Sequence, residues 1–139
     1  MINKQFASHL PSLLKTLLLT STLTLSLMFS AGSSAEWTYM GVSNGNKWYL
    51  DFDRIRKSNG LVYYWEVVDL LEPFNGLMST KTYYKGDCET FREMQLSISA
   101  YELPMAEGNA KDTFTPEPRW EYVRRGSTGD AKLKAVCNH

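Results

Sequence analysis

The first 35 residues have the features of an export signal, which leaves only the rest of the chain to fold. The only charged residues in this segment are Lys4 and Lys15, and an apolar stretch rich in Leu, Thr and Ser follows them. The segment ends in Ser-Ser-Ala, which offers the small residues that a cleavage site requires. We therefore expect residues 1–35 to be a signal peptide that is cleaved after Ala35, and residues 36–139 to be the mature domain.

The leader is a poor candidate for a permanent membrane anchor. Thr and Ser dilute its apolar stretch, which falls short of a typical membrane-spanning helix. No cysteine stands where the leader ends, so the sequence does not indicate a lipid at the mature N-terminus. The sequence therefore predicts an exported protein with no membrane span after cleavage.

The chain contains two cysteines, Cys88 and Cys137. Exported proteins fold where thiols oxidise, so we expect these two residues to form a disulfide bond. The alternatives are two free thiols or two zinc ligands, but zinc needs four ligands and the mature chain has a single histidine, His139. The mature chain has the size of one small domain, which a disulfide would stabilise by roughly 4 kcal/mol.

Strand patterns dominate the mature chain. Asn-Gly at 44–45 separates two strand-like segments and predicts a hairpin, and Met94, Leu96, Ile98 and Ala100 alternate with mostly polar residues. We expect an α+β fold that is mainly β, with a single antiparallel sheet of five to six strands and one short C-terminal helix fastened by the disulfide. The expected strands are 36–42, 47–52, 61–70, 77–84, 94–100 and an edge strand within 119–124, with a long surface loop over 104–118.

The segment 61–70, LVYYWEVVDL, is expected to be a central strand. Aromatic and β-branched residues occupy both of its faces, which is typical of a strand covered on both sides. Trp65 is therefore expected to lie in the core. Glu66 stands out as an acid among apolar residues.

The C-terminal residues follow a helical pattern. Ser127 and Asp130 have the spacing of a capping box, and Leu133, Val136 and Cys137 follow at i, i+3 and i+4. The sequence therefore predicts one short helix whose apolar stripe includes Cys137. The disulfide would fasten this helix to the sheet near the start of the fifth strand.

The charge balance argues against a nucleic-acid partner. The chain has fifteen basic and fifteen acidic residues, and the leader holds two of the basic ones, so the mature chain is slightly acidic. Domains that bind phosphate backbones normally show a basic excess concentrated on one face. We therefore expect no nucleic acid among the partners.

The sequence offers little support for catalysis. His139 is the last residue, which is a poor place to hold a catalytic base, and no Gly-rich phosphate loop, metal-ligand cluster or haem-attachment motif is present. We expect no enzyme activity and no cofactor. Five acids invite a paired-carboxylate interpretation, although acids at strand ends and in turns usually solubilise loops: Asp51, Asp53, Glu66, Asp69 and Glu72.

Aromatic residues and two basic clusters are the candidates for contact with a partner. One short helix can cover only one face of the sheet, so aromatics on the other face could meet a second subunit or a ligand. The basic clusters are candidates for an anionic ligand, with ordinary solvated surface as the alternative. These clusters are Arg54, Arg56 and Lys57, and separately Arg119, Arg124 and Arg125.

One ordered set of short motifs spans nearly the whole mature chain. It consists of Trp37, Trp48-Tyr49-Leu50-Asp51, Ile55-Arg56, the strand 62–69 with Trp65 and Glu66, Ser79, Tyr84, Asp87-Cys88, Trp120, Gly126-Ser127 and Cys137. In this order the motifs resemble the surface-adhesin protein E family of Gram-negative bacteria.

The resemblance implies a small antiparallel sheet with a C-terminal helix and a disulfide, and no enzyme activity. It also implies an adhesin that binds host extracellular-matrix or serum proteins and can self-associate into a homodimer. The expected location is outside the cytoplasm: periplasmic, secreted or associated with the outer-membrane surface. The alternative is a soluble periplasmic envelope or stress-related protein without a host ligand.

Overall fold

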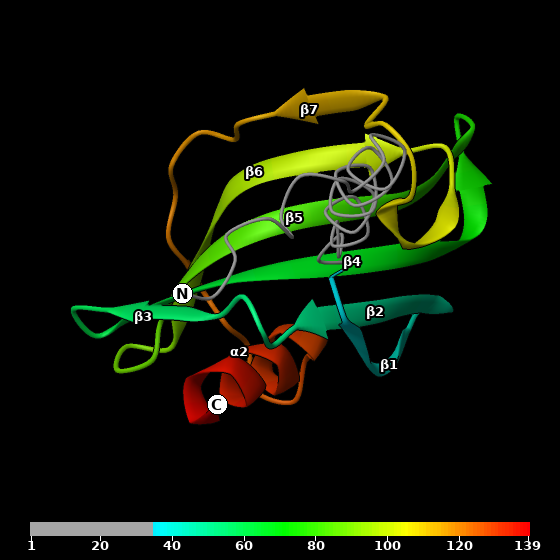
Figure 1. The fold of residues 1–139 in the computed structure, drawn as a ribbon. Helices are drawn as coiled ribbons and strands as arrows, with labels where there is room; N and C mark the ends of the chain where they lie inside the picture. Colours follow the sequence, from blue (N-terminus) through cyan, green and yellow to red (C-terminus); the bar gives the residue numbers. More distant parts are fainter. Residues whose placement is uncertain (1–34) are drawn as a thin grey trace, which may run out of the picture. The chain divides into compact units, whose positions relative to one another are not determined.

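Within residues 35–139, eight antiparallel strands form one sheet and one α-helix packs against it (Figure 1). The computed structural model describes residues 35–139. Apart from Ala35, the expected signal peptide lies outside this range, so its cleavage stays a prediction. Within the described residues, no helix is long and apolar enough to cross a membrane.

The elements follow one another with short connections up to the end of β6. They are β1 (Trp37–Ser43), β2 (Asn46–Asp51), β3 (Arg56–Ser58), β4 (Leu61–Phe74), β5 (Leu77–Asp87), β6 (Arg92–Tyr101), the 3-10 turn η2 (Pro104–Ala106), β7 (Asp112–Phe114), β8 (Glu121–Tyr122) and α2 (Thr128–Asn138). The path through the sheet is β1-β2-β4-β5-β6-β7, with β3 also paired to β4 and β8 to β6. β4 is therefore an interior strand, as the sequence predicts.

The prediction of five to six strands is wrong, because β3 and β7 add to the expected set. Both are three residues long, and their side chains are exposed. Strands this short, with mostly polar residues, are too short to show the alternation of apolar and polar residues from which a strand is recognised in a sequence. Their pairing with β4 and β6 depends on the neighbouring strand and not on their own composition.

Three Asn-Gly pairs, at 44–45, 59–60 and 75–76, set the register of three hairpins. Both residues of each pair have positive φ, for example 51° at Asn44 and 82° at Gly45. Two-residue turns with this geometry match the twist of antiparallel strands, and Asn and Gly tolerate it. Because the third turn begins only at Asn75, β4 continues through Pro73 beyond its expected end.

The C-terminal helix is capped and fastened as expected. The Ser127 side chain accepts a hydrogen bond from the backbone N–H of Asp130, which satisfies one of the free donors at the start of α2. Cys88 and Cys137 form a disulfide with their Cα atoms 5.8 Å apart. This bond joins the last turn of α2 to the β5–β6 connection.

The core lies between α2 and one face of the sheet. Leu50, Val62 and Tyr64 are fully buried there against Leu133 and Val136 of the helix. On β5 both Tyr84 and Gly86 face the helix, and Gly86 lies close to Leu133. A Cβ atom at Gly86 would lie 2.7 Å from Leu133 Cδ1 and 2.9 Å from Val62 Cγ1, so the helix approaches the sheet closely only because no side chain is there.

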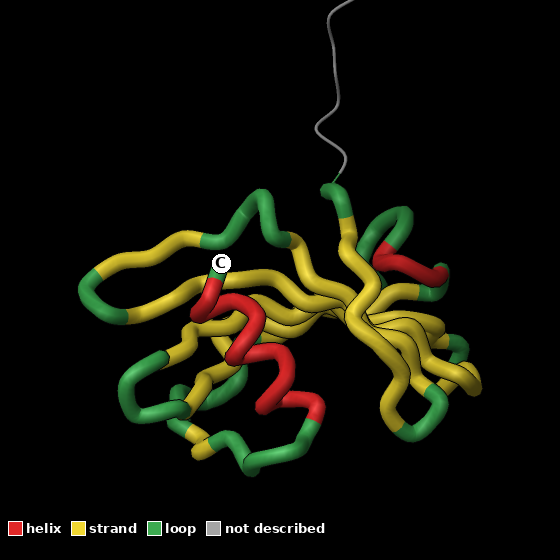
Figure 2. The backbone as a smooth tube through the Cα atoms, turned by 90° about the horizontal axis from the view of Figure 1, so that it is seen from below, coloured by secondary structure: helices red, strands yellow, loops and turns green. Residues whose placement is uncertain are grey.

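The opposite face of the sheet, here called the open face, has no α-helix over it within the described residues. Figure 2 shows α2 and η2 as separate helical segments, and η2 contacts only one end of the open face, where Asp69 and Ser79 bind its backbone N–H groups. Trp65 points to this face and is half-buried. Its predicted place in the core is therefore wrong, because both faces of β4 are apolar although the helix covers only one.

Candidate protein-binding surface

The open face carries a row of aromatic rings separated by cations. Directly opposed residues of antiparallel strands share a face, so the register places Tyr63 beside Lys85 and Trp65 beside Tyr83. The alternation along β5 puts Lys81 on this face too. We call the following set the aromatic band: Tyr63, Trp65, Lys81, Tyr83, Lys85, Arg92, Tyr101 and Trp120.

Three rings of the band pack against one another and still present area to solvent, whereas the ring of Tyr101 is buried. The Trp65 and Tyr83 rings stack with their centroids 4.5 Å apart and their planes 24° apart, and Tyr63 lies 6.3 Å from Tyr83. The side chains of Tyr63, Trp65 and Tyr83 are only half-buried. Aromatic residues of this kind are enriched in protein interfaces, because they bury a large apolar area with little loss of side-chain freedom.

Two lysines of β5 each lie between two rings. The Lys81 Nζ atom is 5.4 Å from the Trp65 ring centroid and 5.5 Å from that of Tyr101. The Lys85 Nζ atom is 5.4 Å from the Trp120 centroid and 6.0 Å from that of Tyr63. Cation–π attraction therefore holds both ammonium groups in place on the band.

The acids of the open face already have partners. Arg92 pairs with Asp87 at 3.3 Å and also lies over the Trp120 ring. Asp87 accepts further hydrogen bonds, first from Thr90, and these lower the pKa of its carboxyl group to about 2. Within residues 35–139, neither Lys81 nor Lys85 has a carboxylate oxygen within salt-bridge distance, so the band keeps two uncompensated positive charges.

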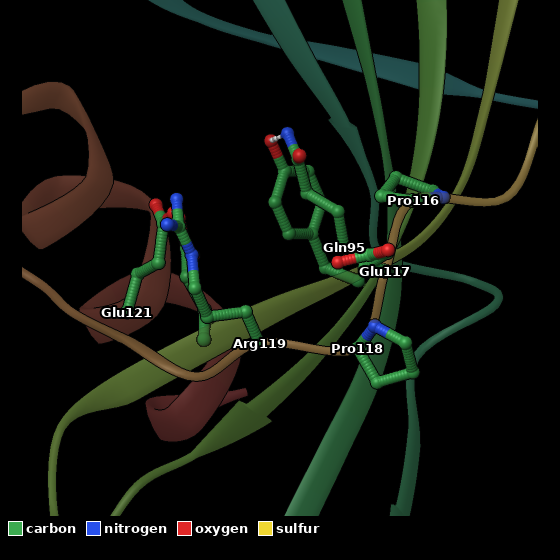
Figure 3. Close-up of a pocket in the computed structure, with 8 residues that line it drawn as sticks. Gln95, Pro116, Glu117, Pro118, Arg119 and Glu121 are labelled. Atoms are coloured by element: carbon green, nitrogen blue, oxygen red, sulfur yellow. Dashed lines mark hydrogen bonds and ion pairs between the residues drawn. The ribbon is translucent and has the colours of Figure 1, made fainter.

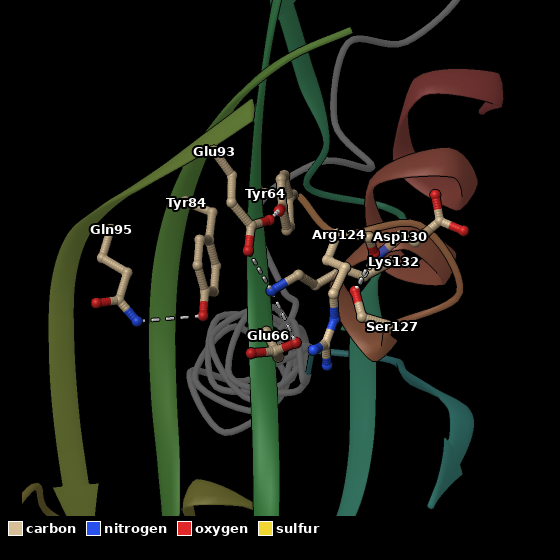
Figure 4. Close-up of polar contacts among 9 residues, drawn as sticks. All are labelled: Tyr64, Glu66, Tyr84, Glu93, Gln95, Arg124, Ser127, Asp130 and Lys132. Atoms are coloured by element: carbon tan, nitrogen blue, oxygen red, sulfur yellow. Dashed lines mark hydrogen bonds and ion pairs between the residues drawn. The ribbon is translucent and has the colours of Figure 1, made fainter. Parts of the chain in front are cut away.

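The face beneath α2 holds a buried ionic cluster with a different role (Figure 4). The Lys132 Nζ atom lies 3.2 Å from Glu66 Oε2 and 3.3 Å from Glu93 Oε1, and it stands 3.7 Å above the Tyr84 ring. Tyr64 donates a hydrogen bond of 2.6 Å to Glu93. These groups satisfy one another and join α2 to three strands, so the cluster supports the fold and offers no free charge to a ligand.

Burial and charge shift the pKa values in this cluster. Burial alone would lower the pKa of Lys132, but the carboxylates of Glu66 and Glu93 outweigh burial and raise it. Burial is also the main reason why the pKa values of Tyr64 and Tyr84 are raised. All three groups therefore keep their protons in the folded protein at neutral pH.

A cleft of about 390 Å³ lies beside this cluster, beneath the segment that leads to β8 (Figure 3). Its polar lining is largely paired: Arg119 is bonded to Glu121, and Gln95 donates to the Tyr84 hydroxyl. Glu117 adds a further acid at the rim. The cleft therefore offers a ligand fewer free groups than the aromatic band does.

The structure divides the first basic cluster between the two faces. Arg56 opposes Tyr63 and so lies on the open face, whereas Lys57 opposes Val62 and donates to the Cys137 carbonyl at the end of α2. Arg54 is bonded to the buried carboxylate of Asp51. Only Arg56 can contribute to the aromatic band.

The second basic cluster lies at the other end of α2. Arg119 borders the cleft, and the exposed Arg124 and Arg125 precede the helix, where the Arg124 carbonyl accepts from Ser127. Lys57 and Arg124 thus lie at opposite ends of this helix, which is about 16 Å long. The structure does not bring the two clusters together into one basic site.

Three of the five acids considered for hydrolysis also lie apart from one another. Glu66 is on the α2 face and is paired with Lys132, whereas Asp69 is on the open face and accepts from the N–H of Met105. Asp51 stands four residues along β2 from the position opposite Asp69, which corresponds to about 13 Å. Among the described residues, no group of His, Cys, Asp and Glu has a metal-binding arrangement.

Sequence reasoning identified the aromatic residues but missed the lysines between them. The signal was the alternation of Lys81, Tyr83 and Lys85 in β5, which places a cation, a ring and a cation on one face. Its meaning depends on which face the helix leaves uncovered, and the sequence pattern does not show this.

Comparison with known proteins gives one family and one fold. The family model described as surface-adhesin protein E matches residues 37–138. A crystal form of Haemophilus influenzae protein E superposes with a TM-score of 0.57 at 16% identity, covering 70% of this chain and 91% of that one. A second structure, protein E from non-typeable Haemophilus influenzae, gives 0.56 at 14% identity with 79% of each chain covered. Among curated proteins no match is found.

Proposed function

Since this chain belongs to the surface-adhesin protein E family, we propose that it is an exported, non-enzymatic adhesin that binds host extracellular-matrix or serum proteins. The aromatic band is the observation that supports this proposal. It offers half-buried rings and two uncompensated cations on a sheet face that no α-helix of the described chain covers. Such a surface suits a protein partner, because aromatic anchors supply most of the binding energy at many interfaces.

The two basic clusters remain secondary candidates for ligand contact. Arg56 adjoins the band, and the exposed Arg124 and Arg125 could contact an acidic partner near the start of α2. The same band could also join two copies of the chain into a homodimer. Analytical ultracentrifugation of the purified protein tests this, since a dimer that uses the band should dissociate when Trp65 and Trp120 are replaced.

Surface plasmon resonance tests the proposal directly. The purified, disulfide-bonded protein is passed over immobilised matrix and serum proteins at two ionic strengths. We expect saturable binding that Trp65→Ser with Trp120→Ser abolishes, and that Arg124→Ser with Arg125→Ser weakens less. Circular dichroism confirms that the variants are folded. If none of the immobilised proteins is bound by folded protein, the adhesin proposal fails.

Fractionation of the producing cells separates the two locations. Exposure on the outer surface supports the adhesin, whereas a freely soluble periplasmic pool supports an envelope or stress-related protein without a host ligand. Trypsin added to intact cells should remove the surface form and leave the periplasmic form untouched.

A further inference from the structure

We propose that the aromatic band binds an extended acidic segment of a partner protein, in which two carboxylates four residues apart flank an apolar residue. The inference rests on the proposed function, because it names the chemistry of the partner at the same surface. Three features support the inference: the spacing of the two lysines, their free charges and the aromatic rings between them.

The first step is the spacing of charges along β5. Lys81, Tyr83 and Lys85 occupy alternate positions of one strand and share the open face. Four residues of strand span about 13 Å, so the two ammonium groups arise from Cα atoms that far apart. An extended segment laid along β5 has the same two-residue period, and its residues at i and i+4 can meet both lysines.

The second step is the surface between the lysines. The residue at i+2 of such a segment would lie over Tyr83, whose ring stacks on Trp65 at 4.5 Å. This stack is apolar and half-buried, and it has no free carboxylate or amide to bind a polar side chain. The band therefore favours an apolar residue at the centre of the segment.

The third step is that the two charges are fixed and that no acid of residues 35–139 pairs with them. Each lysine is held between two rings at 5.4 to 6.0 Å, and the ring quadrupole attracts the ammonium group without cancelling its charge. Arg92 differs, because Asp87 already compensates it. The carboxylates of a partner would thus bind two ammonium groups whose positions are already restricted, so little side-chain entropy is lost on binding.

These features favour a polypeptide over a sulfated polysaccharide. Binding of a long polyanion depends on many cations along its path, as for nucleic acids, whereas the band offers two free lysines and Arg56 at its margin. Most of its area is aromatic. The mature chain also has more acidic than basic residues, so a long polyanion gains little from the rest of the surface.

The test uses three synthetic peptides and the indole N–H signals of the protein in two-dimensional NMR. The probe TTETLTETT has carboxylates at i and i+4 around leucine, TETTLTTET has the wrong spacing, and TTKTLTKTT has the opposite charge. We expect the first probe to shift the Trp65 and Trp120 signals. The signal of Trp48, which is buried beneath α2, should not move.

Charge exchange makes the result specific to the two lysines. Lys81→Glu with Lys85→Glu should weaken binding of TTETLTETT about tenfold and should create binding of TTKTLTKTT. Lys81→Arg with Lys85→Arg should retain it. The matched control is Lys111→Glu with Lys134→Glu, the same charge change at side chains that are 61% and 59% exposed elsewhere on the molecule, and it should leave binding unchanged.

Equal binding of all three peptides would overturn the inference. Tighter binding of a heparin fragment that displaces TTETLTETT would overturn it too, because it would assign the band to polysaccharides. The inference and the proposed function can fail separately. Binding of TTETLTETT without binding to any matrix or serum protein sinks only the adhesin proposal. Matrix binding that Lys81→Glu with Lys85→Glu leaves intact sinks only the inference.

Discussion

At the scale of single residues, Lys132 shows what a sequence pattern misses. Glu66 was recognisable as an acid among apolar residues of β4, and its partner was not, because Lys132 precedes Leu133 on a helix whose stripe was defined by apolar residues. The structure buries Lys132 against two carboxylates from different strands. Glu66 and Lys132 are 66 positions apart in the sequence, so no local spacing of residues indicates that they pair.

The same cluster predicts loss of stability in alkaline solution. The pKa values of Tyr64 and Tyr84 are raised above 10.0 and that of Lys132 above 10.5, so the unfolded chain releases these protons first as the pH rises. The stability that they contribute is therefore complete below about pH 10 and is lost above it. Urea unfolding between about pH 8 and pH 12 should show a falling free energy of unfolding.

A matched pair of substitutions tests whether this cluster causes the loss of stability in alkaline solution. Tyr64→Phe removes one of the raised groups and should flatten the fall in stability above about pH 10. Tyr122→Phe makes the same change at a ring that is 75% exposed and should leave the profile unchanged. Equal alkaline profiles for Tyr64→Phe and the wild type would show that the cluster does not govern alkaline stability.

At the scale of elements, the long patterned segments were predictable and the short paired ones were not. The hairpin at Asn44-Gly45, the interior β4 and the capped α2 each carry a local signal, namely a turn dipeptide, an apolar run and a helical stripe. β3 and β7 carry none, since their pairing is set by β4 and β6. The side of β4 covered by the helix was equally unpredictable, because the residues from Leu61 to Val68, apart from Glu66, are apolar or aromatic on both faces.

The contact between α2 and the sheet gives the next prediction. Gly86→Ala should destabilise the protein by about 1–3 kcal/mol, because the new methyl group would lie within 3 Å of Leu133 and Val62 in a packed core. The free energy of unfolding in urea measures this. In the double variant Gly86→Ala with Leu133→Ala the methyl group has room, so the two losses should be less than additive. Strict additivity would contradict the close approach.

At the scale of the whole molecule, a balanced composition hides an uneven charge distribution. Equal numbers of basic and acidic residues suggested no electrostatic preference. The register sorts Lys81, Lys85 and Arg56 onto the open face, where the acids Asp69 and Asp87 are already hydrogen-bonded. The candidate surface therefore arises from topology, and composition alone could not have revealed it.

The expected processing of the chain is also a property of the whole molecule. β1 begins at Trp37, two residues after the expected cleavage site at Ala35. Cleavage there would leave every described strand intact. Intact-mass measurement of the exported protein should give the mass of residues 36–139 with one disulfide. A mass that includes residues 1–35 would show that the leader is retained.

The position of the disulfide also determines how the chain would carry a mechanical load. Cys137 is two residues from the C-terminal end, so tension applied between the two ends passes across the bond to Cys88 and bypasses the 48 residues between them. These residues include β6 and most of α2, and their chain, about 160 Å long when extended, would not lengthen under the load. A molecule under tension would therefore extend only through β1 to β5. The aromatic band would be divided, because its residues on β4 and β5 would bear the force whereas Trp120 would not.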